Sequence, residues 1–182
     1  MSELLNQLSN INVSGDIDKT KIVKEIGDYI SSNNYTVVEL NDQKPWGAYF
    51  RFDNKDADLF VAEFFPGLSP SEARLGNNDL ELSPKILLVA PKQRLSWQYH
   101  DHRSERWAFL NAGAYCHSLT DEEGELQTAS AGDIVQFATS ERHRLIGSLA
   151  TYTLVAEIWQ HTNPAIPSAE DDIVRLQDDY NR

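Results

Sequence analysis

The chain has 182 residues, which suits one domain with a modest extension, and its apolar and charged fractions are those of a globular protein. Its formal net charge of −12 repels phosphate backbones and anionic lipid, so nucleic acid and membrane surfaces are not expected partners. A small anionic ligand would need a local cluster of Arg or Lys that acts against this field.

Residues 1–42 predict a helix followed by a strand. Asp18 can cap a helix whose apolar residues recur at helical spacing. These residues are Ile22, Val23, Ile26, Tyr29 and Ile30. The polar residues 31–34 interrupt the pattern, and the β-branched run at 35–40 predicts a strand. We therefore expect residues 1–42 to form an extension to a main domain of residues 43–182.

From Lys44 onward the sequence changes to short apolar runs separated by turn residues. The runs are GAYFRF, LFVAEFF, KILLVA, RLSWQYH, RWAFLNAGAYCHSL, DIVQFA and TYTLVAEIW. Short strands separated by turns rich in Gly, Pro, Asn and Asp predict an all-β sandwich or barrel. In this part a helix is expected only over residues 170–180, where acidic residues precede Ile173 and Val174.

Residues 95–107, LSWQYHDHRSERW, concentrate side chains that can bind a metal ion. Alternate residues of a strand share a face, so Gln98, His100 and His102 line one side if the strand runs that far. A turn would bring Glu105 back beside them, and His143 follows a later strand. Such a set suits Zn, Mn, Fe, Co or Ni. The competing interpretation is that the histidines are surface or hydrogen-bonded residues of a polar barrel face.

Four segments, in this order, resemble the motifs of type II phosphomannose isomerases, which belong to the cupin superfamily of small jelly-roll barrels. KPWGAYFRF is similar to their R-P-W-G-x-Y, and LSWQYHDHRSERW to their L-S-L-Q-x-H-H-H-R-x-E-H-W. AGDIVQFATSERHRL is similar to E-G-D-x-x-x-I-P-A-G-x-x-H-R-x, and the tail EDDIVRLQDDYNR to E-D-D-I-V-R-x-E-D-x-Y-G-R. The resemblance covers residues 44–182 and implies a mainly β protein with a double-stranded β-helix (cupin) barrel.

By this resemblance, the barrel holds one divalent metal ion, with zinc as the first expectation and Mn, Co, Fe or Ni as alternatives. The implied ligands are Gln98, His100, Glu105 and His143, because the usual cupin motif leaves four residues between the second ligand and the glutamate. A two-residue gap would use His102 in place of Gln98. On the longer spacing His102 becomes a pocket residue.

The implied reaction interconverts mannose 6-phosphate and fructose 6-phosphate, which moves a proton between C1 and C2. A metal ion would polarise the substrate oxygens and stabilise the enediolate. Glu157 is the first candidate for the base that transfers the proton, and His102 is the second. The residues expected to bind the phosphate stand at or near arginine positions of the motifs. They are Arg103, Arg144, Arg175 and Lys44, the last of which replaces a motif arginine.

The chain departs from these motifs close to the expected metal site. Asp101 and Arg106 replace motif histidines, and residues 138–140 replace Pro-Ala-Gly, which changes the charge and shape beside the ligands. Two other functions therefore stay open. One is another cupin enzyme, such as an Fe(II) dioxygenase or a sugar epimerase, and the other is a sugar-binding cupin without turnover.

Composition and resemblance together predict the compartment and the partners of the protein. Its one cysteine, Cys116, can form no intramolecular disulfide, and neither a signal peptide nor a membrane span stands out. We therefore expect a cytoplasmic protein. The expected partners are a small sugar phosphate and, by resemblance to cupins, a second copy of the chain in a homodimer.

Overall fold

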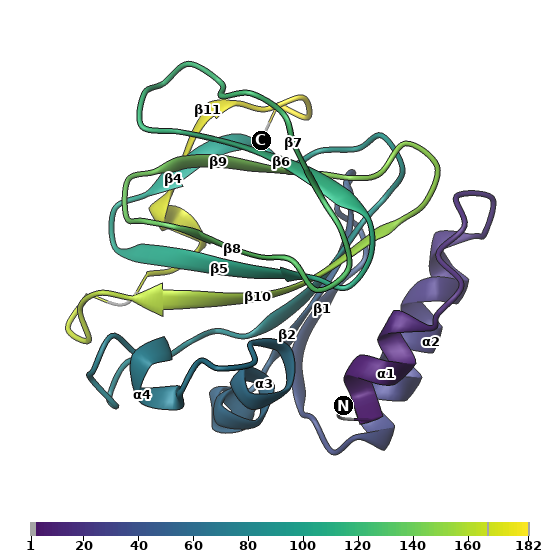
Figure 1. Ribbon diagram of the computed structural model, residues 1–182, viewed down its shortest axis with the longest axis horizontal. Coiled ribbons are helices and arrows are strands. Elements are labelled where there is room, and N and C mark those ends of the chain that lie inside the picture. Colours follow the sequence, from purple (N-terminus) through teal and green to yellow (C-terminus); the bar gives the residue numbers. More distant parts are fainter. Residues whose placement is uncertain (1–2, 167, 182) are drawn as a thin grey trace.

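The computed structural model describes residues 3–166 and 168–181, whose strands form two antiparallel sheets that face each other (Figure 1). In order across the first sheet lie β1 (Val37–Asn41), β2 (Gly47–Phe52), β3 (Lys85–Val89), β10 (Thr153–His161), β5 (Arg103–Phe109) and β8 (Ile134–Phe137). In order across the second lie β11 (Ile173–Gln177), β4 (Trp97–His100), β9 (Arg142–Ile146), β6 (Gly113–Ser118) and β7 (Gln127–Ala129). This is a jelly roll, so the predicted mainly β cupin fold is confirmed.

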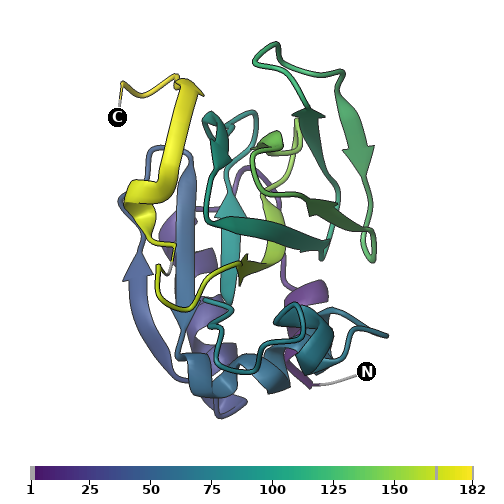
Figure 2. The same cartoon turned by 90° about the vertical axis from the view of Figure 1, so that its left-hand side faces the viewer.

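The helices gather on the outer side of the first sheet (Figures 1 and 2). They are α1 (Glu3–Ser9), α2 (Lys19–Ser32), α3 (Ala57–Phe64) and α4 (Pro70–Ala73), with the 3-10 turn η1 (Asn54–Asp56) leading into α3. A second 3-10 turn, η2 (Glu170–Asp172), directly precedes β11. In the described part of the chain, none of these helices has both the length and the apolar character needed to cross a bilayer.

Helix α2 begins where the sequence predicts it, because the Asp18 carboxylate accepts a hydrogen bond from the backbone N–H of Thr20 at 2.8 Å. Its buried face packs toward β2, where a Cβ on Gly27 would make ordinary van der Waals contact with the Phe50 ring, at 3.7 Å. The N-terminal residues are therefore part of the core, and β1 extends the first sheet by pairing with β2.

Two segments differ from their predicted structure. The run LFVAEFF, predicted as a strand, belongs to α3, because Ala57, Phe60, Val61 and Phe64 fall on one helical face and are all buried. The helix expected over residues 170–180 is also wrong: after the single turn η2, the chain forms strand β11, which pairs antiparallel with the edge of β4. Main-chain partners offered by that edge outweigh a weak helical pattern.

Two apolar cores lie on opposite faces of the first sheet. The larger core lies between the sheet and the helices and includes Ile26 of α2, Phe50 of β2 and Phe60 of α3. The smaller core lies between the two sheets and includes Trp107 of β5 and Phe137 of β8. Because the helices complete the larger core, one end of the space between the sheets can hold polar and charged side chains.

Replacing Ile26 with Ala is expected to destabilise the whole domain. The Ile26 side chain is fully buried, and deleting such a group costs about 2–5 kcal/mol of unfolding free energy. Urea denaturation followed by circular dichroism measures this change. Lys24→Ala on the same helix is the control, since the Lys24 side chain is 75% exposed. Equal stability of the two variants would contradict the docking of α2 on the sheet.

Candidate functional site

Two histidines and a glutamate meet between the two sheets. His100 ends β4, Glu105 lies on β5 and His143 lies on β9. Pairing of β4 with β9, together with the short turn between β4 and β5, brings these strands together. Each residue is 1% exposed, and one nitrogen or carboxylate oxygen from each lies within 4.8 Å of the others. We call His100, Glu105 and His143 the triad.

Hydrogen bonding defines the tautomer of His143. Its Nδ1 lies 2.9 Å from the backbone carbonyl oxygen of Glu141, which can only accept, so Nδ1 carries the proton. In the neutral ring, Nε2 then presents a lone pair to Oε2 of Glu105 at 3.3 Å, and neither of these buried atoms has a hydrogen-bond partner. Two acceptors that face each other repel, and a cation between them would remove the repulsion.

The protonation states of His100 and Glu105 also suit a metal ion. Burial lowers the pKa of His100, so its ring is neutral, and its Nε2 lies 3.0 Å from Oε1 of Glu105. Burial alone would raise the pKa of Glu105, but the contact with His100 and the positive charge of Arg103 hold it well below its usual range. Neutral imidazoles and an ionised carboxylate are donors that divalent transition metals prefer. The triad therefore fits such an ion.

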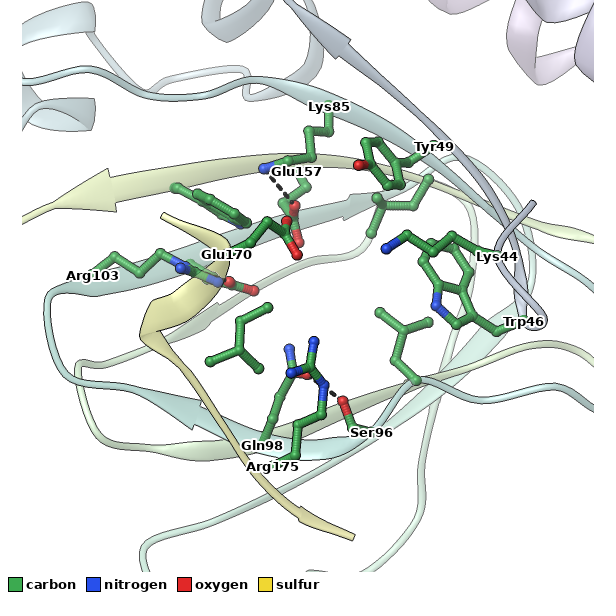
Figure 3. Close-up of a pocket in the computed structure, with 15 residues that line it drawn as sticks. Lys44, Trp46, Tyr49, Lys85, Ser96, Gln98, Arg103, Glu157, Glu170 and Arg175 are labelled. Atoms are coloured by element: carbon green, nitrogen blue, oxygen red, sulfur yellow. Dashed lines mark hydrogen bonds and ion pairs between the residues drawn. The ribbon is translucent and has the colours of Figure 1, made fainter. Parts of the chain in front are cut away.

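A cavity of about 510 Å³, partly open to solvent, adjoins the triad at Glu105 (Figure 3). Its apolar lining consists of Trp46, Leu87, Leu95, Trp159 and Ile173. Its polar lining consists of Lys44, Tyr49, Lys85, Ser96, Gln98, Arg103, Glu105, Glu157, Glu170 and Arg175. Cations outnumber carboxylates here although the whole chain is strongly acidic, so the cavity favours an anionic ligand.

Gln98, the fourth expected metal ligand, lies on β4 and faces this cavity. Its Oε1 accepts a hydrogen bond of 2.5 Å from the Ser96 hydroxyl, which orients the amide. A carbonyl oxygen has two lone pairs, so Oε1 keeps one for a second partner. Arg175 of β11 lies directly opposite Gln98 in the strand pairing.

Glu157, the first candidate base, points into the cavity from β10. Its Oε1 accepts a hydrogen bond of 3.0 Å from the indole N–H of Trp107, and its Oε2 lies 3.3 Å from the Lys85 ammonium. Burial, together with the negative charge of Glu105, raises the pKa of Glu157 to about 7. Burial lowers the pKa of Lys85 to about 8. A carboxyl group that titrates near neutrality can both take and return a proton.

Sequence reasoning did not place Lys85 or Trp159 in the site. The Lys85 ammonium lies 3.1 Å from the centre of the Trp159 ring, and the Arg103 guanidinium carbon lies 3.5 Å from it, so both cations interact with this indole. The available signal was small. Lys85 opens the apolar run KILLVA in phase with Leu87, and both residues line the cavity.

Three of the residues expected to bind the phosphate line the cavity, and they differ in their hydrogen bonds and ion pairs. Arg103 is committed to the protein: its Nε donates to Oε1 of Glu105 at 2.9 Å, and its Nη1 donates to the Ser168 hydroxyl at 2.5 Å. Its Nη2 lies 3.3 Å from Nε2 of His100. The side chains of Lys44 and Arg175 form no ion pair with any carboxylate that the structure describes.

Two expected site residues, His102 and Arg144, belong neither to the triad nor to the cavity lining. His102 is exposed, because β4 ends at His100 and the chain turns before the next inward position. Arg144 follows His143 on β9 and therefore points to the opposite face, where its Nη1 donates to both carboxylate oxygens of Glu123 at 2.9 Å. The structure thus separates both residues from the cavity that holds Glu157.

Comparison with known proteins identifies the fold and nothing finer. The fold is that of cupin-type jelly rolls. No protein-family model and no curated protein sequence matches the chain.

Among similar solved structures is the capsular polysaccharide assembling protein CapF from Staphylococcus aureus, with 11% identity, a TM-score of 0.51, and coverage of 89% of this chain and 39% of that one. Another is a deletion mutant of oxalate decarboxylase from Bacillus subtilis, with 10% identity, a TM-score of 0.50, and coverage of 76% and 30%. This chain therefore spans less than half the length of either protein.

Proposed function

We propose that this protein is a metal-dependent sugar-phosphate isomerase that interconverts an aldose phosphate and a ketose phosphate. Mannose 6-phosphate is the first substrate to test, because the motif resemblance points to it. One observation carries the proposal: a single cavity joins a buried carboxyl group of raised pKa, Glu157, to Glu105 of the triad and to two cations that form no ion pair with any carboxylate the structure describes. Proton transfer, polarisation of oxygen and binding of an anion are the three requirements of this reaction.

His100, Glu105 and His143 would hold the metal ion, with Gln98 as the fourth ligand. Zinc is the first candidate, and Mn, Co, Fe or Ni are the alternatives. When bound, such an ion supplies Lewis-acid stabilisation of negative charge on the substrate oxygens at C1 and C2. Arg103 holds Glu105 in place through the hydrogen bond from its Nε to Oε1.

Glu157 is the group that would move the proton between C1 and C2. Its carboxyl lies in the cavity wall, and the hydrogen bond from Trp107 fixes its orientation. The adjacent Lys85 ammonium stabilises the ionised form, in which Glu157 can remove a proton from carbon. Once protonated, the same carboxyl can return the proton to the neighbouring carbon. The apolar residues of the cavity, Trp46, Leu87 and Leu95 among them, reduce the access of water to this step.

A second candidate function is acid–base sugar chemistry without a metal ion, as in an epimerase. The contact between Arg103 and Glu105 favours it, because this guanidinium already balances the charge of the buried carboxylate. An epimerase would exchange the substrate proton without metal and would form no ketose. One assay therefore separates the two candidates.

That assay uses purified protein, stripped of metal and then reloaded with Zn, Mn, Co, Ni or Fe(II). Mannose 6-phosphate in deuterated water is followed by NMR for fructose 6-phosphate and for deuterium at C2. Metal-dependent formation of the ketose is the expected result. Exchange that needs no metal and gives no ketose would favour the epimerase. No turnover and no exchange with any metal would overturn the isomerase with this substrate.

A further inference from the structure

Arg175, Trp46 and Lys44 carry donors at the cavity that have no partner among the described residues, as does the indole Nε1 of Trp159. The Nε of Arg175 and the indole Nε1 of Trp46 are both buried and form no hydrogen bond. The Lys44 ammonium forms no ion pair and lies 5.5 Å from the centre of the Tyr49 ring. Buried donors without acceptors cost free energy, so an arrangement that keeps them is suited to an acceptor from outside the chain.

Fully buried cations of this protein, unlike the half-buried Lys44 and Arg175, are paired with carboxylates. Arg103 pairs with Glu105, Lys85 with Glu157, and Arg144 with Glu123. Carboxylates outnumber cations by 28 to 16 in the sequence. Arg175 nevertheless pairs with none that the structure describes, although Glu170 lines the same cavity. Arg175 therefore differs from Arg103, Lys85 and Arg144, each of which forms an ion pair inside the protein.

The three donors face one space. Lys44 and Trp46 reach it from the segment that leads into β2, and Arg175 reaches it from β11, which belongs to the other sheet (Figure 3). Glu157 and Lys85 lie across the cavity from Arg175 (Figure 3). An elongated ligand could therefore place an anionic end at Arg175 and its other end at Glu157.

We infer that Arg175, Trp46 and Lys44 form an anion subsite that takes the phosphate group of the ligand and, once filled, ties β11 to the segment before β2. Arginine offers the planar fork that matches phosphate oxygens, the indole N–H adds a neutral donor, and Lys44 adds charge. Arg103 is not part of this subsite, because its nitrogens are engaged by Glu105, His100 and Ser168. The inference rests on the proposed function only in assigning the phosphate to a sugar.

A phosphate bound between β11 and the segment before β2 should restrict the motion of β11, because β11 is an edge strand. Asp172 anchors its start by accepting hydrogen bonds from the backbone N–H groups of Asp101 and His102, both at 3.1 Å. Beyond that anchor, the strand partner of β11 among the described residues is β4, and Nη2 of Arg144 donates to the backbone oxygen of Gln177 at 3.3 Å. A phosphate held between Arg175 and the other sheet adds an attachment to that sheet. Amide exchange over residues 173–177 should therefore slow when the subsite fills.

The test titrates the whole protein with inorganic phosphate and follows the indole N–H resonance of Trp46 by NMR, with sodium chloride at equal ionic strength as the reference. We expect a saturable shift and slower exchange over residues 173–177. Arg175→Gln should weaken phosphate binding by about 10- to 100-fold. Arg142→Gln is the matched control, because Arg142 pairs with Asp121 outside the cavity and should leave binding unchanged. Trp46→Phe, which keeps an aromatic ring and removes the donor, is a second variant whose affinity should fall.

Additional measurements distinguish inorganic phosphate from a sugar phosphate as the ligand, and distinguish the subsite proposal from the isomerase proposal. Mannose 6-phosphate should bind with the same dependence on Arg175, and mannose should cause no shift of this resonance. Saturable binding that Arg175→Gln weakens, without turnover in the isomerase assay, would keep the subsite and overturn the isomerase. Turnover whose KM is unchanged by Arg175→Gln would keep the isomerase and overturn the subsite. Absence of a saturable shift with phosphate would also overturn the subsite.

Discussion

Replacing His143 with Ala is expected to abolish retention of a divalent metal ion. The lone pair of its Nε2 faces Oε2 of Glu105 at 3.3 Å, so this ring supplies a metal-ligand atom that an alanine cannot replace. Loss of an outer partner of a metal ligand already costs 10- to 100-fold in affinity, so loss of the ligand itself should exceed about 100-fold. Metal content after dialysis and calorimetric titration with zinc measure the change.

His102→Ala is the matched control for this prediction. His102 is exposed and lies outside the cavity, so its removal should leave metal affinity unchanged. Gln98→Ala should weaken metal binding, because Gln98 faces the cavity beside the triad. If His102→Ala lost metal and Gln98→Ala retained it, the ligand set would have to move along the chain. Retention of metal by His143→Ala would contradict the triad as the metal site.

Replacing Glu157 with Gln should remove most of the catalytic activity of the proposed isomerase. The amide keeps the size of the side chain and an acceptor for the Trp107 N–H, but it cannot take a proton. Loss of a positioned base costs on the order of 10²- to 10⁴-fold in kcat. Steady-state kinetics with mannose 6-phosphate measure the effect, and KM should change little because the phosphate is held elsewhere.

The pH dependence of this reaction follows from the pKa of Glu157. Burial and the charge of Glu105 raise that pKa to about 7, and the base must be ionised to act. We therefore expect kcat/KM of the wild type to increase as the pH rises through about 7. Glu122→Gln, on an exposed loop, should change neither rate nor profile. Full activity of Glu157→Gln would show that another group moves the proton.

Local patterns in the sequence were sufficient for much of the fold. Short apolar runs between turn residues predicted the strands, and the Asp18 cap predicted the start of α2. The local patterns gave the wrong element where a short apolar run was compatible with both a strand and a helix. In LFVAEFF the buried residues Ala57, Phe60, Val61 and Phe64 follow helical spacing, and only packing against the first sheet decides for α3. The tail became a strand because the edge of β4 offered it hydrogen bonds.

Strand geometry explains how the expected site residues are distributed. Residues two apart on a strand share a face, which places Gln98 and His100 on the interior side, while neighbours alternate, which turns Arg144 away from His143. The alternation on β9 could have excluded Arg144 from the sequence alone. The end of β4 at His100 could not be read there, because turn residues 101 and 102 are polar like the strand residues before them.

The residues alone were sufficient to predict a mainly β fold of the cupin type, an acidic surface, and the candidates His100, Glu105, His143 and Glu157. Which side chains share a cavity depends on the packing of the strands. Lys85 reaches Glu157 through the pairing of β3 with β10, strands that lie far apart in the chain. Arg175 shares a cavity with Trp46 because β11 joins the second sheet. The pairing register of strands that are distant in the chain depends on the free energy of the whole packed fold, so it cannot be predicted from local propensity.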